Sequence, residues 1–292
     1  MTILIEGKFM ETNIIRAIIN LVNYPLTNVP FSSEGTNRVN IAGDSLENYI
    51  KNLFAGTLSE TDETSRRDKF NKYFSYFGNS NNPPDLIIKN GDAVEVKKVE
   101  MSSSGLALNS SYPKAKLFSD SRMITSACKS CENWTVKDII YAIGTVKNSF
   151  LSSLVMVYGM DYAADAEVYN RVKNSITEGL SKISDIELAE TNELGRVNKV
   201  DPLGITYLRV RGMWHIDNPL RVFSYIYSQN LEKDFNFMAL INCEKYLSFP
   251  QNDRLELEKL FHSGHLSISD VKISDPNNPA KLKEAKLITF SI

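Results

Sequence analysis

The sequence predicts a mixed α/β protein in which helices flank a central β-sheet. Segments with apolar residues at helical spacing alternate along the chain with short runs of β-branched and aromatic residues. Between two of these runs, Asn90 and Gly91 form a strong signal for a β-hairpin turn. The chain has 292 residues, of which 42% are hydrophobic and 23% are charged, so it is long enough to bury a substantial core around such a sheet.

The expected helices lie between the β-prone runs. Residues 44–55 are predicted to form a helix with Asp44 or Ser45 as its N-cap and with Gly56 just past its end. A loop and a short helix are expected over residues 57–72. The remaining helices are predicted from apolar spacing at 11–23, 135–149 (capped at Thr135), 162–183 and 252–261.

The expected strands are runs rich in apolar and β-branched residues. Besides the hairpin, they are residues 150–160, 204–214, 235–243 and the C-terminal KLITFSI. Residues 101–122, which are rich in Ser, Asn and Gly, are expected to form an ordered loop. We see no internal repeat and no low-complexity linker, so residues 1–292 are expected to form a single domain.

The most informative segment is PDLIIKNGDAVEVKKVE, residues 84–100. Because side chains alternate along a strand, Glu95 and Lys97 are expected to project from the same face, and Asp85 begins the preceding strand. Magnesium prefers carboxylate oxygens and retained waters, so Asp85 and Glu95 are candidate ligands, with the carbonyl group of Val96 as a third. Lys97 is a candidate to contact a scissile phosphate and to position or deprotonate the attacking water.

The same pattern also arises by chance, because exposed hairpins often alternate Glu and Lys on a solvated face. Three features favour a site over that interpretation: the other face of the second strand is apolar, the turn is explicit, and a preceding helix carries Glu47. Glu47 is placed where a further carboxylate can reach the same metal ion.

These residues resemble a known nuclease superfamily. The pattern PD…EVK after a helix that carries Glu is similar to the PD-(D/E)XK superfamily, and NPPDLIIKNGDAVEVKKVE followed by LALNSSYPKAKL resembles the NgoPII-type family of type II restriction endonucleases. The similarity is densest over residues 40–125. It implies a restriction-endonuclease-like core in which Asp85 and Glu95 hold Mg²⁺, Lys97 is the catalytic lysine and Glu47 is the helix acid.

The resemblance also implies a biological role. It points to restriction–modification defence by a homodimer that cuts both strands of double-stranded DNA at a short palindromic site, with GGCC as the associated sequence. The catalytic core is then expected over about 40–160, with DNA-recognition and dimerisation elements at about 100–125 and 195–292. Two alternatives remain open: a DNA repair or junction-resolving nuclease of the same superfamily, and a non-catalytic DNA-binding protein on the same fold.

Candidate DNA-binding residues occur in two places. The first follows the hairpin, where polar and basic side chains of types that contact phosphates and base edges are Asn109, Ser110, Ser111, Tyr112, Lys114 and Lys116. The second is the strand that carries Arg209 and Arg211, with Arg196, Lys199 and Arg221 as further phosphate contacts. For Arg209 and Arg211, ion pairing with acids of the 162–193 region is an equally good interpretation.

Charge and composition exclude several classes. The net charge of −2 argues against a nonspecific DNA coat, although residues 111–150 and 195–225 each carry a net +3 and residues 151–194 a net −5, which fits a distinct binding face. Cys128, Cys131, His262 and His265 have zinc-ligand types but unrelated spacing, so coincidence is the better interpretation. No glycine-rich phosphate loop appears, and we expect no ATP requirement. We also expect no membrane span, no signal peptide and a cytoplasmic location.

Overall fold

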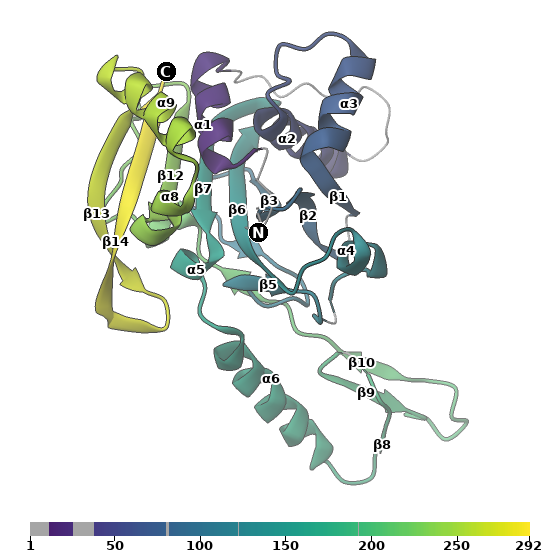
Figure 1. Cartoon of the computed structure of the whole chain (residues 1–292). Helices are drawn as coiled ribbons and strands as arrows, with labels where there is room; N and C mark the ends of the chain where they lie inside the picture. The colour runs from purple at the N-terminus through teal and green to yellow at the C-terminus, as the bar shows by residue number, and fades with distance from the viewer. Residues whose placement is uncertain (1–11, 26–37, 80–81, 122, 192) are drawn as a thin grey trace, which may run out of the picture.

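The structure is a computed structural model that describes residues 12–25, 38–79, 82–121, 123–191 and 193–292. Its central feature is a β-sheet whose strands follow the order β1-β2-β3-β6-β7-β12-β14-β13 (Figure 1). The sheet is mixed, because β3–β6 and β7–β12 are parallel while the other neighbours are antiparallel. The predicted mixed α/β class is therefore confirmed. These strands span Phe74–Asn79 (β1), Asn82–Ile88 (β2), Ala93–Val99 (β3), Val136–Lys147 (β6), Phe150–Tyr158 (β7), Asn236–Asn242 (β12), Ser267–Asp275 (β13) and Asn278–Ser291 (β14).

The two faces of the sheet are covered by two separate hydrophobic cores. One core lies under α1, α2 and α9. Helix α1 is capped by Asn13, whose side chain accepts hydrogen bonds from backbone N–H groups of the first turn. The other core lies on the opposite face, under shorter helices and loops. These helices span Ile14–Asn23 (α1), Arg38–Ala55 (α2), Glu63–Tyr73 (α3), Ser126–Ser130 (α4), Gly159–Tyr162 (α5), Pro219–Val222 (α7), Cys243–Ser248 (α8) and Gln251–His262 (α9). None of the described helices is both long enough and apolar enough to cross a lipid bilayer.

The segment 135–149, predicted as a helix, forms the strand β6 instead. Residues 139–146 are all buried, and their side chains alternate between the two cores. A strand that is covered on both faces has a continuous apolar run, which periodicity alone does not distinguish from a buried helix. The expected helix cap at Thr135 is therefore wrong, and Tyr141 becomes a sheet residue beside the predicted hairpin.

One further boundary differs from the predictions, at the start of α2. Helix α2 begins at Arg38, so Asp44 and Ser45 lie inside it and neither is its N-cap. Gly56 follows the helix with a φ of 62°, the left-handed conformation expected just past a helix end. The helix is longer than predicted because the preceding residues also have helix-compatible spacing, which a local cap signal cannot override.

An arm extends away from the body of the molecule, as Figure 1 shows. It consists of α6 (Ala166–Ser181) and a small antiparallel sheet of β8 (Glu187–Leu188), β9 (Gly195–Asn198) and β10 (Leu208–Val210). The predicted strand 204–214 is therefore wrong over most of its length, because only its middle pairs, and it pairs within the arm. The central part of the predicted helix 162–183 is confirmed.

The expected loop at 101–122 contains two short strands. β4 (Leu106–Ala107) pairs with β11 (His215–Ile216), and β5 (Lys116–Phe118) pairs with β6. Because β6 is the sheet neighbour of β3, the β5–β6 pairing holds the loop beside the predicted hairpin.

Candidate active site

Asp85 lies where β2 separates from β3. The two strands form the predicted hairpin, but the residue pairs between them are Leu86 with Val94 and Ile87 with Ala93. Beyond this pair, the backbone N–H of Val96 donates its hydrogen bond to the carboxylate of Asp85, at 2.6 Å from Oδ2, and not to a backbone carbonyl of β2. The separation of the strands therefore opens a space that Asp85 faces from one side.

Glu95 and Lys97 project into this space from β3. They lie on the same face of the strand, as predicted, while the intervening Val96 packs into the core under α2. Lys97 Nζ lies 2.7 Å from Glu95 Oε1. The other carboxylate oxygen, Glu95 Oε2, is buried and has no hydrogen-bond partner among the described residues.

Glu47 reaches the same region from α2, which packs against β3. Its negative charge is close enough to contribute to the raised pKa of Asp85. It also forms an ion pair with Lys51, one turn later on α2, at 3.8 Å. The helix acid thus adds to the negative potential of the site and lies at its margin.

The site holds more negative charge than its own lysine balances. Burial, together with the charges of Glu95 and Glu47, raises the pKa of Asp85 to about 9. Burial by itself lowers the pKa of Lys97, but the surrounding carboxylates outweigh burial and leave it above its ordinary value. Lys97 is therefore an ammonium at neutral pH, and the carboxylates around it favour an additional cation.

The donor set fits magnesium better than a metal held only by side chains. The described residues include no cluster of three or more His, Cys, Asp or Glu side chains able to hold a metal. Mg²⁺ is usually bound through one or two carboxylates and keeps several waters. Asp85, the unpartnered Oε2 of Glu95 and the carbonyl group of Val96 meet that requirement, whereas a closed zinc site does not fit here.

These residues line a cleft together with most of the predicted DNA-binding loop. Three hydrogen-bonding side chains of the lining were missed by the sequence analysis: Asn79 and Asn82 in the Asn-rich approach to Asp85, and Tyr141, which was assigned to a helix. The composition of the Asn-rich segment was the available signal for the first two. The lining includes Asp85, Glu95, Lys97, Asn79, Asn82, Asn109, Ser110, Ser111, Tyr112, Lys114 and Tyr141.

The loop is fixed by backbone hydrogen bonds and aromatic packing. The N–H of Trp214 donates to the carbonyl of Asn109 at 2.7 Å, which continues the β4–β11 pairing. Tyr112 stacks on Tyr169 of α6, with ring centres 5.3 Å apart, and meets the edge of Trp214. The base of the arm therefore holds the loop over the cleft.

The sequence profile of the NgoPII restriction endonuclease family matches residues 12–274. The chain belongs to the NgoPII restriction endonuclease family. It is 56% identical, over 281 residues, to the type II restriction enzyme NgoPII of Neisseria gonorrhoeae, and the alignment covers 96% of this chain and 100% of that enzyme. No solved structure matches the chain.

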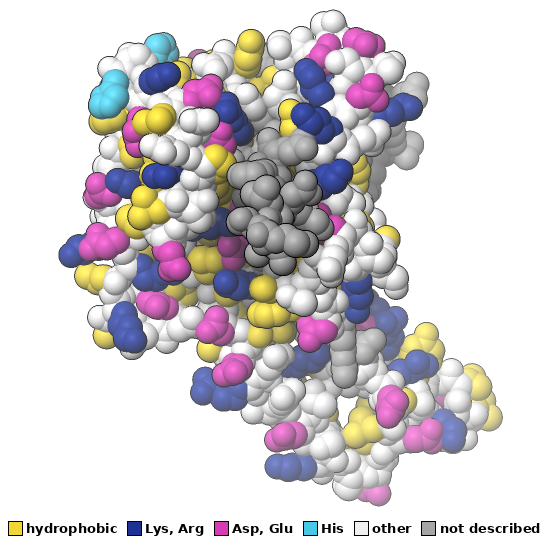
Figure 2. All heavy atoms as spheres, in the orientation of Figure 1, with side chains coloured by type: hydrophobic (Ala, Val, Ile, Leu, Met, Phe, Trp, Pro, Cys, Tyr) yellow, Lys and Arg dark blue, Asp and Glu magenta, His cyan; other side chains and the backbone are white. Residues whose placement is uncertain are grey.

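Membership of the NgoPII family makes the chain a site-specific restriction endonuclease, whose substrate is DNA. On the face of the molecule drawn in Figure 2, basic and acidic side chains are interspersed over the body and the arm. That face therefore has no continuous basic surface that would mark a DNA-binding site.

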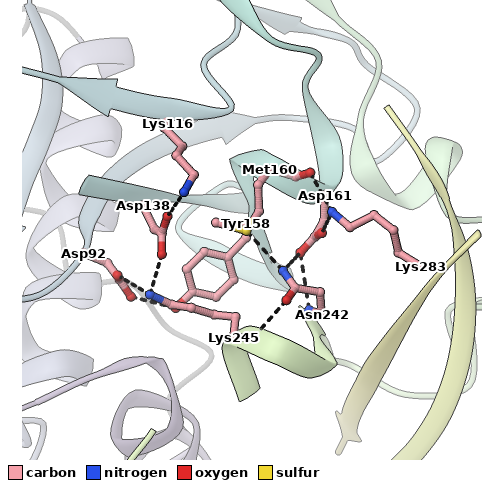
Figure 3. Close-up of polar contacts among 9 residues, drawn as sticks. All are labelled: Asp92, Lys116, Asp138, Tyr158, Met160, Asp161, Asn242, Lys245 and Lys283. Carbon is pink, nitrogen blue, oxygen red and sulfur yellow. Dashed lines mark hydrogen bonds and ion pairs between the residues drawn. The ribbon is translucent and has the colours of Figure 1, made fainter. Parts of the chain in front are cut away.

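The remaining predicted DNA-binding residues of this NgoPII-family enzyme lie outside the cleft. Arg209 and Arg211 both pair with Glu193, at 2.5 and 2.6 Å, which matches the ion-pair interpretation of the sequence. Lys116 lies 3.4 Å from Asp138 of β6 (Figure 3). The other basic candidates have partners too, since Lys199 pairs with Glu187, Arg221 with Asp217, and Arg196 lies over the ring of Tyr207.

The residues of zinc-ligand type lie in different parts of the fold. Cys128 is buried in α4, and Cys131 contacts Ser75 of β1. His262 ends α9 and His265 follows it, with Nδ1 of His265 hydrogen-bonded to Ser263. Within the described structure, the two cysteines and the two histidines therefore do not form a common metal site.

Proposed function

We propose that this restriction endonuclease is a Mg²⁺-dependent, type II deoxyribonuclease that cuts both strands of double-stranded DNA at a short palindromic, GGCC-like site, as a cytoplasmic homodimer and without ATP. The observation that carries the proposal is the grouping of Asp85, Glu95 and Lys97 in one cleft, with a buried carboxylate oxygen that has no partner among the described residues. The palindrome and its sequence rest on the family resemblance. The proposed catalytic core covers about 40–160, with recognition and dimerisation elements at about 100–125 and 195–292.

Each group at the site has a distinct proposed role. Asp85, Glu95 and the carbonyl group of Val96 would hold the metal, and Glu47 would add negative charge at its margin. When bound, Mg²⁺ supplies charge neutralisation at the phosphate and a more acidic water. Lys97, an ammonium held against Glu95, donates to a phosphate oxygen or to the attacking water and orients it; its raised pKa favours this donor role over that of a general base.

Digestion of plasmid DNA tests the proposed function. We expect discrete fragments with Mg²⁺ alone and no cleavage with EDTA, because a carboxylate site without its cation lacks the charge that the phosphate requires. Added ATP should change neither result. Sequencing the fragment ends would identify the site, and cleavage confined to branched DNA, or an absolute need for ATP, would contradict the proposal.

Outside the two ranges given above for dimerisation, helix α6 of the arm offers a further surface for the proposed homodimer. Val168, Val172 and Ile176 follow one another at four-residue intervals, so they form an apolar stripe on one side of α6, and all three are exposed. The cations of the small sheet are already paired with acids of the arm. The arm is therefore better suited to a protein partner than to phosphates.

Replacing both Val172 and Ile176 with aspartate is expected to convert the homodimer to monomers, because two charges would be buried at the interface. Sedimentation velocity measures the change. The matched control is Asn174→Asp, on the opposite side of the helix, which should leave the dimer intact. Unchanged dimerisation of the double variant would place the interface elsewhere.

A further inference from the structure

Lys114 is a buried cation at the catalytic cleft. The residue is 8% exposed, and it lines the same cleft as Asp85 and Glu95. Its Nζ donates a hydrogen bond to Ser111 Oγ at 2.8 Å and lies 4.9 Å from the centre of the Tyr112 ring. Both partners are neutral, and among the described residues no carboxylate forms an ion pair with this ammonium.

Other lysines of comparable burial are paired. Lys137, the only other described lysine that is less than a tenth exposed, forms an ion pair with Glu132. Lys245 lies between Asp92 and Asp138, at 2.7 and 2.8 Å. Figure 3 shows these two contacts of Lys245 and also the ion pair between Lys283 and the buried carboxylate of Asp161. The fold thus supplies counter-charges for its structural lysines and leaves Lys114 without one.

The position of Lys114 is fixed by the strand that neighbours Glu95. Its backbone N–H donates to the hydroxyl of Tyr141 at 2.7 Å, and both groups are buried. Tyr141 in turn is the register partner of Glu95 in the parallel β3–β6 pair. The β3–β6 pairing, through Tyr141, therefore fixes the position of Lys114 relative to Glu95.

A buried ammonium without a counter-ion is costly, and the cost falls when an anion enters the cleft. Burial lowers the pKa of Lys114 to about 8, which expresses the same cost, although the negative charge of Glu95 opposes it. The anion that this enzyme brings to the cleft is a DNA phosphate. During hydrolysis the reacting phosphate gains negative charge, so a cation that touches it binds the transition state more strongly than the ground state.

We propose that Lys114 is a catalytic residue whose ammonium binds a non-bridging oxygen of the phosphate that is cut, an inference that rests on the proposed function. This role differs from that of a backbone contact elsewhere along the DNA. Such a contact lowers affinity when it is removed, whereas removal of Lys114 lowers the rate of the chemical step.

The test compares the parent enzyme with Lys114→Met, which keeps the length of the side chain and removes its charge. In single-turnover cleavage with Mg²⁺, the rate constant is expected to fall by about 100-fold or more. DNA affinity, measured without divalent cations, is expected to fall by less than about 10-fold, since one phosphate contact among many is lost. Lys114→Arg should recover part of the rate because it restores the charge.

Lys137→Met is the matched control, because it removes a paired lysine of equal burial from outside the cleft. It is expected to lower the melting temperature and to keep the parental rate at temperatures well below that transition. Lys114→Met should not lower the melting temperature, since it removes an uncompensated charge. A parental rate in Lys114→Met, a loss confined to affinity, or a melting temperature lowered as in the control would each overturn the proposal. A parent enzyme that cuts no DNA with Mg²⁺ would instead refute the proposed function.

Discussion

Replacing Asp85 with asparagine is expected to abolish cleavage, with the single-turnover rate constant reduced by about 1,000-fold or more. The amide keeps the size of the side chain but removes one of the two carboxylates that would hold Mg²⁺. It also weakens the contact with the Val96 N–H. The measurement is cleavage over a range of Mg²⁺ concentrations, together with metal binding by calorimetry. Full activity at an unchanged Mg²⁺ requirement would remove Asp85 from the mechanism.

The same variant has an expected effect on stability that separates a lost metal ligand from a damaged fold. The pKa of Asp85 is raised in the folded protein to about 9, against about 4 in an unfolded chain. The stabilising contribution of its protonated form is therefore fully present below about pH 4 and is lost as pH rises towards 9. Without metal, Asp85→Asn should melt at a higher temperature than the parent at pH 8 and at a similar one at pH 4. A lower melting temperature at pH 8 would contradict this account.

Replacing Lys97 with methionine is expected to reduce the rate constant by about 100- to 1,000-fold while metal binding remains. The lysine donates to the phosphate or to the water and is not itself a ligand. Its removal leaves Glu95 Oε1 without its partner at 2.7 Å, so both oxygens of Glu95 become free for a cation. Calorimetric titration with Mg²⁺ should therefore show affinity equal to or higher than that of the parent. Loss of Mg²⁺ binding would instead place Lys97 among the groups that organise the metal site.

The sequence predicted the centre of the site because that centre is local. Asp85, Glu95 and Lys97 belong to one hairpin whose Asn-Gly turn fixes the register, and alternation along a strand places the last two on one face. Tyr141 could not be found in this way. It comes beside Glu95 only through a parallel pairing with β6, whose apolar run was assigned to a helix.

The outer DNA-binding candidates were less predictable for another reason. Arginine in a strand is equally suited to bases and to carboxylates, so the role of Arg209 depends on which acid the fold brings near it. The structure places Glu193 against it. Similarly, Lys114 and Lys116 are indistinguishable in the sequence, yet Lys114 is buried without a carboxylate and Lys116 pairs with Asp138.

The parallel pairing of β3 with β6 also makes the cleft depend on residues that come later in the chain than its acids. Asp85 and Glu95 leave the ribosome early, but the wall of the cleft that holds Lys114 is completed only when β6, which ends at Lys147, can pair. A slip of this register by one residue would turn Glu95 into the opposite core. A polypeptide that lacks β6 therefore carries both acids without Tyr141, whose hydroxyl accepts the hydrogen bond from the backbone N–H of Lys114.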